Sequence, residues 1–344
     1  MSNNEQSRSG DLRVAVVGAG AMGADHISRI TTTITGATVS AVVEPDAARR
    51  AAALSSAPAA AGYASFAEAL DAGAADAVLI ATPGQFHEQT LMEALAARLP
   101  ILCEKPLTQD PVSSLRVVGA EQEIGRKLIQ VGFMRRFDRE YEQLRALIEA
   151  GSAGELLMLH AAHRNAAVPD SYVQSMLITD SVVHEFDVVP WLAGGTITSV
   201  EVRYGRRNGL TPERLREPIL VVMELDNGVL VDVEMNVSIQ FGYQVATEAV
   251  FEKGVARIGQ PSGLQLWQDG VFRIGEHADF TTRFAEAYDR QVQAWVDAAK
   301  VGEIAGPSAW DGYKVAVACE AGVRAMETDG PIPVELPDVP SLYR

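Results

Sequence analysis

The segment Thr179–Asp187 carries two carboxylates and an imidazole at helical spacing. Asp180, His184 and Asp187 are four and three residues apart, and residues at these offsets lie on one face of an α-helix. A histidine has an ordinary pKa of about 6.5, so it can accept a proton at neutral pH. A carboxylate one turn earlier can orient the imidazole and stabilise its charged form. The spacing therefore indicates a proton-handling pair, Asp180 and His184, with Asp187 as a structural acid.

Two other interpretations of this pair stay open from the segment alone. An aspartate and a histidine one turn apart also supply two metal ligands. The sequence has no third ligand at an obvious spacing, and a catalytic zinc takes three protein ligands, so we predict no metal. A buried Asp–His pair can also be purely structural. Only the surrounding elements distinguish this role from a catalytic one.

Residues up to 133 alternate between strands and helices. The apolar runs LRVAVV, ATVSAVV, DAVLIA, PILCE and KLIQV are separated by helical patterns, which is typical of βαβ units on a parallel sheet. After residue 133 a helix, longer strands, a DNG turn at Asp226–Gly228 and two closing helices follow. We expect a flexible tail over residues 1–10, a doubly wound α/β domain of the Rossmann type over 11–133, and an α+β domain over 134–344.

Composition and charge exclude several classes of protein. Of the 344 residues, 47% are hydrophobic and 22% charged, with a formal net charge of −16, so phosphates of nucleic acids or anionic membranes would be repelled. The two cysteines, Cys103 and Cys319, form no C-x-x-C motif. The first residues lack the apolar stretch of a secretory signal, and no run reaches the length of about 18 apolar residues that spans a membrane. We expect a cytoplasmic protein with reduced thiols.

The sequence GAGAMG joins the first predicted strand to the first helix. It comprises residues 18–23, of which we expect Gly18, Gly20, Ala21, Met22 and Gly23 to bind the cofactor. In G-x-G-x-x-G, the first glycine allows the tight turn, the second lets a pyrophosphate approach the backbone, and the third allows close packing of helix on strand. The phosphate then lies on backbone N–H groups at the helix amino end. This motif predicts a dinucleotide site.

Glu44 ends the second predicted strand, at about the separation from the glycines expected for the acid that binds the ribose. A carboxylate accepts a hydrogen bond from the ribose 2′-hydroxyl but repels a 2′-phosphate. NAD is therefore the favoured cofactor. Arg49 and Arg50 follow closely and are able to reach a 2′-phosphate, so NADP stays the alternative.

Two further segments, ATPGQFH and CEKP, follow buried strands. Ligands of open parallel sheets bind beyond the carboxyl ends of the strands. We therefore expect five residues beside the cofactor: Thr82, Pro83, His87, Glu104 and Lys105. His87 is either a cofactor contact or a loop residue. Lys105 can donate a hydrogen bond to a substrate hydroxyl.

Six segments together resemble the glucose–fructose oxidoreductase and inositol dehydrogenase (Gfo/Idh/MocA) family: GAGAMG, EKP, GFMRRFD, AHRN, TDSVVHEFD and GPSAWDGY. The resemblance extends from Leu12 to beyond Tyr313, and within the family it is greatest to bacterial inositol dehydrogenases. It implies a Rossmann domain followed by an α+β domain with a large, open, mostly antiparallel sheet. It also implies a homo-oligomer, specifically a tetramer, in which this sheet makes contacts.

The resemblance further implies that Lys105, Asp180 and His184 form the catalytic group. The implied polyol site consists of Arg135, His163, Asn165, Asp180, His184 and Tyr243. These side chains offer both donors and acceptors, which adjacent hydroxyls need. The sequence departs from the family pattern at Glu44, where inositol dehydrogenases often carry aspartate, in the loop after Asn165, and between Arg203 and Pro218. The match at Tyr243 rests on a short, divergent stretch.

We therefore expect NAD-dependent oxidation of myo-inositol to 2-keto-myo-inositol. His184 acts as base, Asp180 supports it, and Lys105 stabilises the developing alkoxide. The nicotinamide accepts the hydride, so no metal is needed. The alternatives on the same scaffold are scyllo-inositol, another inositol isomer, a monosaccharide or an anhydrosugar. A cofactor-sensing regulator without chemistry is a further alternative, although it has no need of all three catalytic residues.

Overall fold

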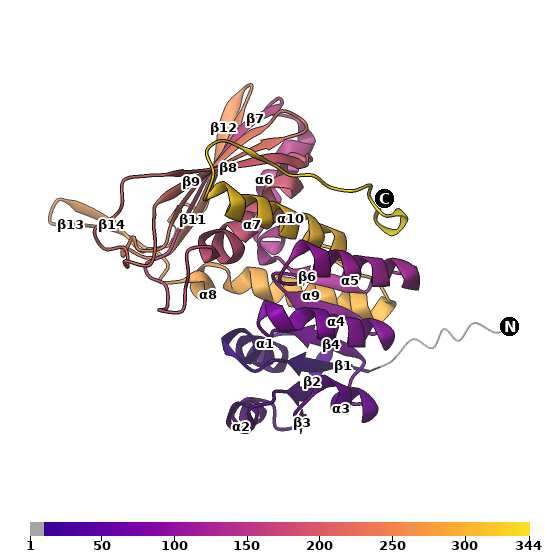
Figure 1. The fold of residues 1–344 in the computed structure, drawn as a ribbon. Coiled ribbons are helices and arrows are strands. Elements are labelled where there is room, and N and C mark those ends of the chain that lie inside the picture. Colours follow the sequence, from indigo (N-terminus) through magenta and orange to yellow (C-terminus); the bar gives the residue numbers. More distant parts are fainter. Residues whose placement is uncertain (1–9, 262) are drawn as a thin grey trace. The chain divides into compact units, whose positions relative to one another are not determined.

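The structure is a computed structural model that describes residues 10–261 and 263–344. The chain forms two compact units. The first contains the N-terminal segment through Gly132, together with Asp289–Tyr313 and Asp338–Arg344, and the second contains Phe133–Tyr288 and Lys314–Pro337 (Figure 1). The predicted tail over residues 1–10 lies outside the described residues except for Gly10.

The first unit is built on six parallel strands in the order β3-β2-β1-β4-β5-β6. The strands are β1 (Leu12–Val17), β2 (Ala37–Val43), β3 (Ala61–Tyr63), β4 (Ala77–Ile80), β5 (Ile101–Glu104) and β6 (Ile129–Gly132). Its first helices are α1 (Ala21–Thr32), α2 (Ala47–Ser56), α3 (Phe66–Asp71), the short η1 (Gly84–Phe86), α4 (His87–Ala96) and α5 (Pro111–Ile124). This strand order is that of dinucleotide-binding Rossmann domains, so the predicted fold of this part is confirmed.

Local signals explain where these helices begin and end. Asp110 accepts a hydrogen bond from the backbone N–H of Ser113, Pro111 occupies the first helical turn, and Gly125 closes α5 with a φ of +73°. Aspartate caps, an early proline and a left-handed glycine are common helix boundaries. These signals account for both ends of α5.

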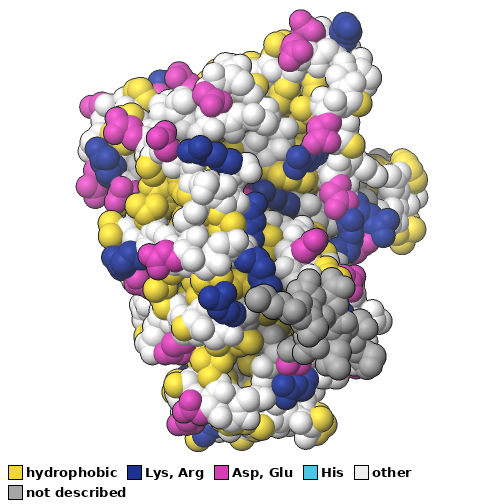
Figure 2. Space-filling view, turned by 90° about the vertical axis from the view of Figure 1, so that its right-hand side faces the viewer, with side chains coloured by type: hydrophobic (Ala, Val, Ile, Leu, Met, Phe, Trp, Pro, Cys, Tyr) yellow, Lys and Arg dark blue, Asp and Glu magenta, His cyan; other side chains and the backbone are white. Residues whose placement is uncertain are grey.

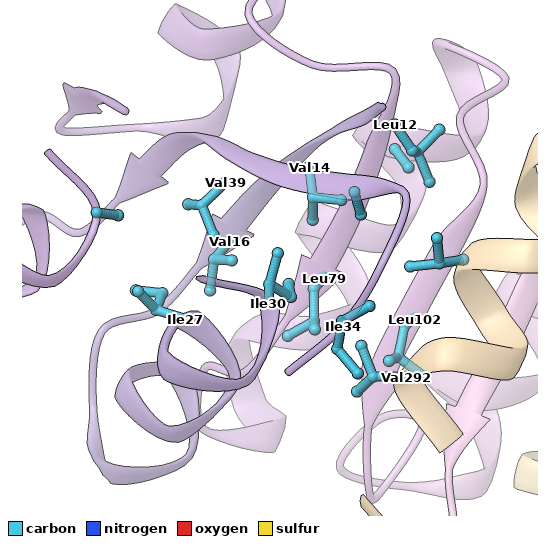
Figure 3. Packing of buried hydrophobic residues seen from close by; sticks show 14 of the residues in the cluster. Leu12, Val14, Val16, Ile27, Ile30, Ile34, Val39, Leu79, Leu102 and Val292 are labelled. Carbon is cyan, nitrogen blue, oxygen red and sulfur yellow. The ribbon is translucent and has the colours of Figure 1, made fainter. Parts of the chain in front are cut away.

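Apolar side chains from both sides of the sequence fill the core of the first unit. Val14 and Val16 of β1 are fully buried, and they belong to one cluster with Ile27 of α1 and with Val292 and Trp295 of the C-terminal helix α9 (Ala285–Val301). Figure 3 shows Val292 beside Leu102 and Ile34. Most of α9 is thus part of the Rossmann core.

The two units divide after Gly132, next to the expected boundary at residue 133. The first unit also takes in Asp289–Tyr313 and Asp338–Arg344, which the expected division placed in the second domain. In Figure 1 the orange helix α9 lies among the purple elements of that unit. The residues that bury this helix come from far along the chain, so local sequence patterns do not reveal the contact.

The second unit contains a seven-stranded sheet in the order β12-β11-β7-β10-β9-β8-β15. Its strands are β7 (Leu156–Arg164), β8 (Ile197–Tyr204), β9 (Ile219–Leu225), β10 (Leu230–Asn236), β11 (Gln244–Phe251), β12 (Gly254–Ile258) and β15 (Ile332–Pro333). Only the pair β7–β10 is parallel among these ladders. The prediction of a mostly antiparallel sheet is confirmed, and Gly228, with φ +84°, lies in the predicted turn between β9 and β10.

The second unit also contains η2 (Met134–Phe137), α6 (Arg139–Ala150), the π-helix η3 (Leu177–Val182), α7 (Val183–Ala193), the hairpin β13 (Gln265–Gln268) and β14 (Val271–Ile274), α8 (Phe280–Arg283) and most of α10 (Ala309–Ala325). The short η4 (Ser341–Tyr343) belongs to the first unit. None of the described helices is long and apolar enough to cross a bilayer. On the face shown in Figure 2, acidic and basic side chains are interspersed with hydrophobic ones.

Candidate active site

The turn between β1 and α1 combines tight packing with one open side. A Cβ on Gly18, where φ is +93°, would lie 2.8 Å from the carbonyl oxygen of Ala81. A Cβ on Gly23 would lie 1.9 Å from the carbonyl oxygen of Gly18, whereas a Cβ on Gly20 would have nothing within 4 Å. The first and third glycines are thus required by packing. The open side of Gly20 is where a pyrophosphate is able to approach the backbone.

The amino end of α1 begins at this open side. Gly20 is the N-cap and has no side chain with which to bond the first-turn N–H groups. Ala21 and Met22 begin the helix, so their backbone N–H groups and the helix dipole are available to a phosphate. We therefore expect Ala21 and Met22 to bind a phosphate through their backbone N–H groups and not through their side chains.

Glu44 fixes the glycine turn as well as ending β2. Its Oε2 accepts a hydrogen bond from the N–H of Ala19 at 3.0 Å, and its Oε1 accepts one from the N–H of Asp46 at 3.0 Å and one from Nη2 of Arg49 at 2.9 Å. Burial would raise the pKa of Glu44, but these bonds together lower it, so the group is charged. A carboxylate has about four lone-pair positions, and three are occupied. One position remains for a ribose hydroxyl.

The two arginines after Glu44 are both directed at that residue. Arg49 forms the ion pair just described, and Nη1 of Arg50 donates to the carbonyl oxygen of Glu44. A guanidinium bound in this way contributes less to a 2′-phosphate site, because it would have to exchange partners. The arrangement agrees with the preference for NAD.

His87 connects the ends of β4 and β5. Its Nε2 lies 2.7 Å from the carbonyl oxygen of Thr82, and its Nδ1 lies 2.7 Å from that of Pro106. Burial lowers the pKa of His87, although both carbonyl contacts favour the protonated ring. The side chain is fully buried. Of the two roles considered for His87, the structure favours the one within the loops.

Glu104 also points into the first unit. Its Oε1 lies 2.8 Å from Nε2 of His26, a buried residue of α1, and its Oε2 accepts a bond from the N–H of Lys105 at 3.3 Å. The predicted cofactor residue Glu104 is therefore a buried support for the segment that carries Lys105. Lys105 itself is half-buried directly after β5, and Pro83 precedes η1 as its N-cap.

The segment with Asp180 differs locally from the regular helix that the spacing suggested. Leu177–Val182 is a π-helix that continues into α7. A π-helix contains more residues per turn than an α-helix, so the expected ridge of Asp180, His184 and Asp187 is not regular. Asp180 is exposed and His184 is buried. Such π-turns are rare and often occur at functional sites.

Asp187 has the structural role that we expected. It is buried, and its carboxylate accepts two hydrogen bonds from Arg136, at 3.0 Å from Nε and 2.5 Å from Nη2. This bidentate pair fixes α7 to η2. No group of three or more His, Cys, Asp or Glu suited to a metal occurs among residues 10–261 and 263–344.

A buried charge cluster that the sequence analysis missed lies beside His184. Glu185 accepts a hydrogen bond from Nη1 of Arg135, and Nη2 of Arg135 lies 3.1 Å from Nδ1 of His163. The same Nδ1 lies 3.4 Å from Oε2 of Glu185. Burial would raise the pKa of Glu185, but the charge of Arg135 and the contact with His163 lower it to about 2. The three residues are at most 3% exposed.

This cluster changes the predicted role of Arg135. A buried guanidinium requires a charged partner, because its desolvation costs several kcal/mol, and Glu185 supplies it. Arg135 is therefore a support inside the unit and not an open lining residue. The only advance sign of Glu185 was its place directly after His184 in the sequence HEFD.

Aromatic rings bring three of the predicted polyol residues together. The ring of His163 lies 5.9 Å from that of Tyr243 and 6.4 Å from that of His184, between centroids. Phe133 packs edge-on against His184, with centroids 6.4 Å apart. Burial raises the pKa of Tyr243, so its phenol is neutral and can both donate and accept a hydrogen bond.

Buried polar atoms of Thr82, Arg135 and Asn165 lack a hydrogen-bond partner within the part of the chain that the structure describes. They are Oγ1 of Thr82, Nε of Arg135 and Oδ1 of Asn165. An unsatisfied buried oxygen costs about 1–3 kcal/mol, so such atoms are expected where a ligand completes the site. Thr82 follows β4 in the first unit, and Asn165 follows β7 in the second.

Known protein families match both the N-terminal part of the chain and the part that carries the seven-stranded sheet. Residues 12–133 match the model of the oxidoreductase family with an NAD-binding Rossmann fold, and residues 141–257 match the GFO/IDH/MocA C-terminal domain. An inositol 2-dehydrogenase of Leifsonia xyli subsp. xyli is 66% identical over 97% of this chain and 98% of its own. One from Corynebacterium glutamicum is 66% identical over 96% and 98%.

A solved structure resembles the whole chain. The myo-inositol dehydrogenase of Lactobacillus casei, crystallised with NAD(H) and myo-inositol, has a TM-score of 0.94 and 32% identity over 97% of this chain and 100% of that one. The scyllo-inositol dehydrogenase of the same organism has a TM-score of 0.87 and 25% identity over 94% and 98%. The first unit is an NAD-binding domain, and the chain belongs to the Gfo/Idh/MocA family of oxidoreductases.

Proposed function

We propose that this protein is an NAD-dependent polyol dehydrogenase that oxidises myo-inositol to 2-keto-myo-inositol. The observation that carries the proposal is similarity over nearly the whole chain. Relatives named inositol 2-dehydrogenase are 66% identical, and the structure with a TM-score of 0.94 contains NAD(H) and myo-inositol. The open glycine turn, the charged Glu44 and the unsatisfied Thr82 and Asn165 oxygens fit a dinucleotide and a polyol.

Three residues of this chain have different roles at the reacting hydroxyl group of the substrate. When bound, NAD accepts the hydride from the substrate carbon. His184 removes the hydroxyl proton, because a buried imidazole is able to do so at neutral pH. Asp180 stabilises the protonated imidazole, and Lys105 donates a hydrogen bond to the developing alkoxide.

The buried cluster supports this arrangement. Since Glu185 stays charged down to a pH of about 2, the Arg135–Glu185 pair holds His163 in place throughout the working range. His163, Asn165 and Tyr243 then offer donors and acceptors to neighbouring ring hydroxyls. A polyol suits such a site, because several hydroxyls need both kinds of partner.

The test compares His184→Ala with His160→Ala. His160 lies on β7, on the opposite side of the strand from His163. His160 pairs with Asp232 at 2.5 Å and its side chain is 41% exposed, so His160→Ala is the matched control. We expect kcat of His184→Ala to fall by about 100-fold or more, with the Kd of NADH unchanged. His160→Ala should retain its turnover. Unchanged turnover in His184→Ala would remove the residue from the mechanism.

The isomer is decided by a substrate panel. Reduction of NAD, and separately of NADP, is followed with myo-inositol, scyllo-inositol, D-chiro-inositol, glucose and levoglucosan. A response to another polyol would keep the mechanism and change the substrate. Silence with all of them, in a protein that still binds NADH, would favour a cofactor-sensing regulator.

We also propose that the chain forms a homotetramer in the cytoplasm. The open sheet of the second unit supports this, since such a face is available for contacts, and both cysteines are buried thiols. Light scattering during size-exclusion chromatography should give a molar mass four times the 36.9 kDa of one chain. A mass of one chain would contradict the proposal.

A further inference from the structure

We infer that two loops of the second unit, residues 166–176 and 207–218, together select among inositol isomers, with Tyr172 and Arg214 as positioning residues. These loops, called the loop pair below, lie in two of the stretches where the sequence departs from the family pattern. The inference rests on the proposed function and concerns which polyol is preferred.

The first loop connects two of the proposed polyol residues, Asn165 and Asp180. Its beginning is fixed by the backbone, because the N–H of Asn165 donates to the carbonyl oxygen of Asn236 at 2.8 Å and its own carbonyl accepts from Ile239 at 3.1 Å. A movement of the loop therefore displaces Asp180 while Asn165 stays in place, and this changes the distance between the two residues.

Tyr172 holds the other end of this loop. Its side chain is 2% exposed. The hydroxyl donates to the carbonyl oxygen of Met176 at 2.6 Å and lies 2.7 Å from Oγ of Ser181. Ser181 directly follows Asp180 in the π-helix, so Tyr172 fixes the turn that presents this carboxylate.

The second loop fixes the first through two side chains. Arg214 donates from Nε to the carbonyl oxygen of Tyr172 and from Nη2 to that of Pro169, both at 2.9 Å. Gln174 accepts a bond from the N–H of Arg216 at 2.7 Å and donates to its carbonyl oxygen at 3.1 Å. A planar guanidinium that bonds two carbonyls fixes their separation.

The second loop is in turn attached to the end of β10. Glu217 is buried, accepts a bond from the hydroxyl of Thr211 at 3.0 Å, and accepts another from the N–H of Val237 at a short distance. Asn208 donates to the carbonyl oxygen of Ser238 at 3.1 Å. Val237 and Ser238 follow Asn236, which holds Asn165. The contacts therefore form a closed chain from Asn165 to Asp180 and back.

Inositol isomers differ only in the orientation of ring hydroxyls, so discrimination depends on where donors and acceptors lie relative to one another. A displacement of about 1 Å changes rates by about 100-fold. Groups left unpaired by the wrong isomer add to the difference. Through these hydrogen bonds, the loop pair sets the positions of Asn165 and Asp180.

The test uses Arg214→Gln, with Arg203→Gln as matched control, because exposed Arg203 pairs with half-buried Glu201 outside the loop pair. We expect Arg214→Gln to raise KM for myo-inositol about tenfold, the equivalent of one lost charged hydrogen bond. The ratio of kcat/KM between myo-inositol and scyllo-inositol should move towards one. KM for NAD and the behaviour of Arg203→Gln should stay at the wild-type level.

Two further variants keep the test decisive. Tyr172→Phe removes only the hydroxyl and should reduce the isomer ratio even if Arg214→Gln does not fold. Arg214→Lys should restore part of the ratio, because one ammonium nitrogen replaces the two nitrogens that bond the carbonyls of Tyr172 and Pro169. An unchanged isomer ratio in folded Arg214→Gln or Tyr172→Phe overturns the inference. Wild-type protein that oxidises no inositol would instead overturn the proposed function.

Discussion

Replacing Glu185 by glutamine should destabilise the protein strongly, because it leaves the charge of Arg135 buried without a partner. The pKa of Glu185 falls from its ordinary 4.5 to about 2 in the folded chain. One pKa unit corresponds to about 1.4 kcal/mol, so the charged form contributes about 3 kcal/mol to folding. Loss of one partner of a buried ion pair typically costs about 3–5 kcal/mol. The two values agree.

The sign of the pH dependence follows from the lowered pKa. This contribution is fully present above pH 4.5 and is lost as the pH falls towards 2. The wild-type protein should therefore lose about 3 kcal/mol of stability over this window from Glu185. Glu185→Gln should lack that part of the acid dependence, since glutamine does not titrate.

The assay is urea unfolding followed by circular dichroism at pH 7 and at several pH values below 5. The matched control is Glu149→Gln, which breaks an exposed pair with Arg145 on α6 and should cost less than about 1 kcal/mol. A double variant, Glu185→Gln with Arg135→Gln, should be less damaged than the sum of its single variants. A Glu185→Gln protein within the range of the control would refute this reasoning.

Three further predictions concern the first unit. Gly20→Ala should keep the wild-type Tm but weaken NADH binding by about tenfold or more, because its Cβ meets nothing within 4 Å of the protein; equal NADH affinity would contradict an approach of pyrophosphate at this turn. Gly23→Ala should instead lower Tm by several degrees, about 2–4 °C for each kcal/mol lost, because its Cβ would lie 1.9 Å from a carbonyl oxygen; thermal unfolding decides. His87→Ala should lower kcat while the KM for inositol changes little, because the ends of β4 and β5 lose their common partner; a change confined to NAD affinity would indicate a direct cofactor contact instead.

Much of the first unit is predictable from the sequence because its signals are local. Buried parallel strands are apolar runs, and the glycines of GAGAMG are required by close backbone contacts that any side chain would prevent. The alternation of His160 and His163 in one strand also gives their different environments, half-buried and buried.

The parts that could not be predicted depend on contacts between distant segments. The π-helix at Leu177–Val182 changes the direction in which the Asp180 side chain points relative to a regular α-helix. The spacing of apolar residues in the sequence does not reveal that one turn contains an additional residue. Glu185 finds Arg135 fifty residues away, and α9 joins the core of a domain that begins with β1. No local sequence signal marks these partners.

The central proposal is tested most directly by following the hydrogen that is transferred. The enzyme is supplied with NAD and myo-inositol that carries deuterium on ring carbon 2, and the reduced cofactor is analysed by mass spectrometry. We predict NADH that contains the deuterium, with 2-keto-myo-inositol as product and a lower rate than with unlabelled substrate. Reduced cofactor without deuterium would place the oxidation at another carbon, and no reduced cofactor at all would contradict the assignment of this protein as an inositol dehydrogenase.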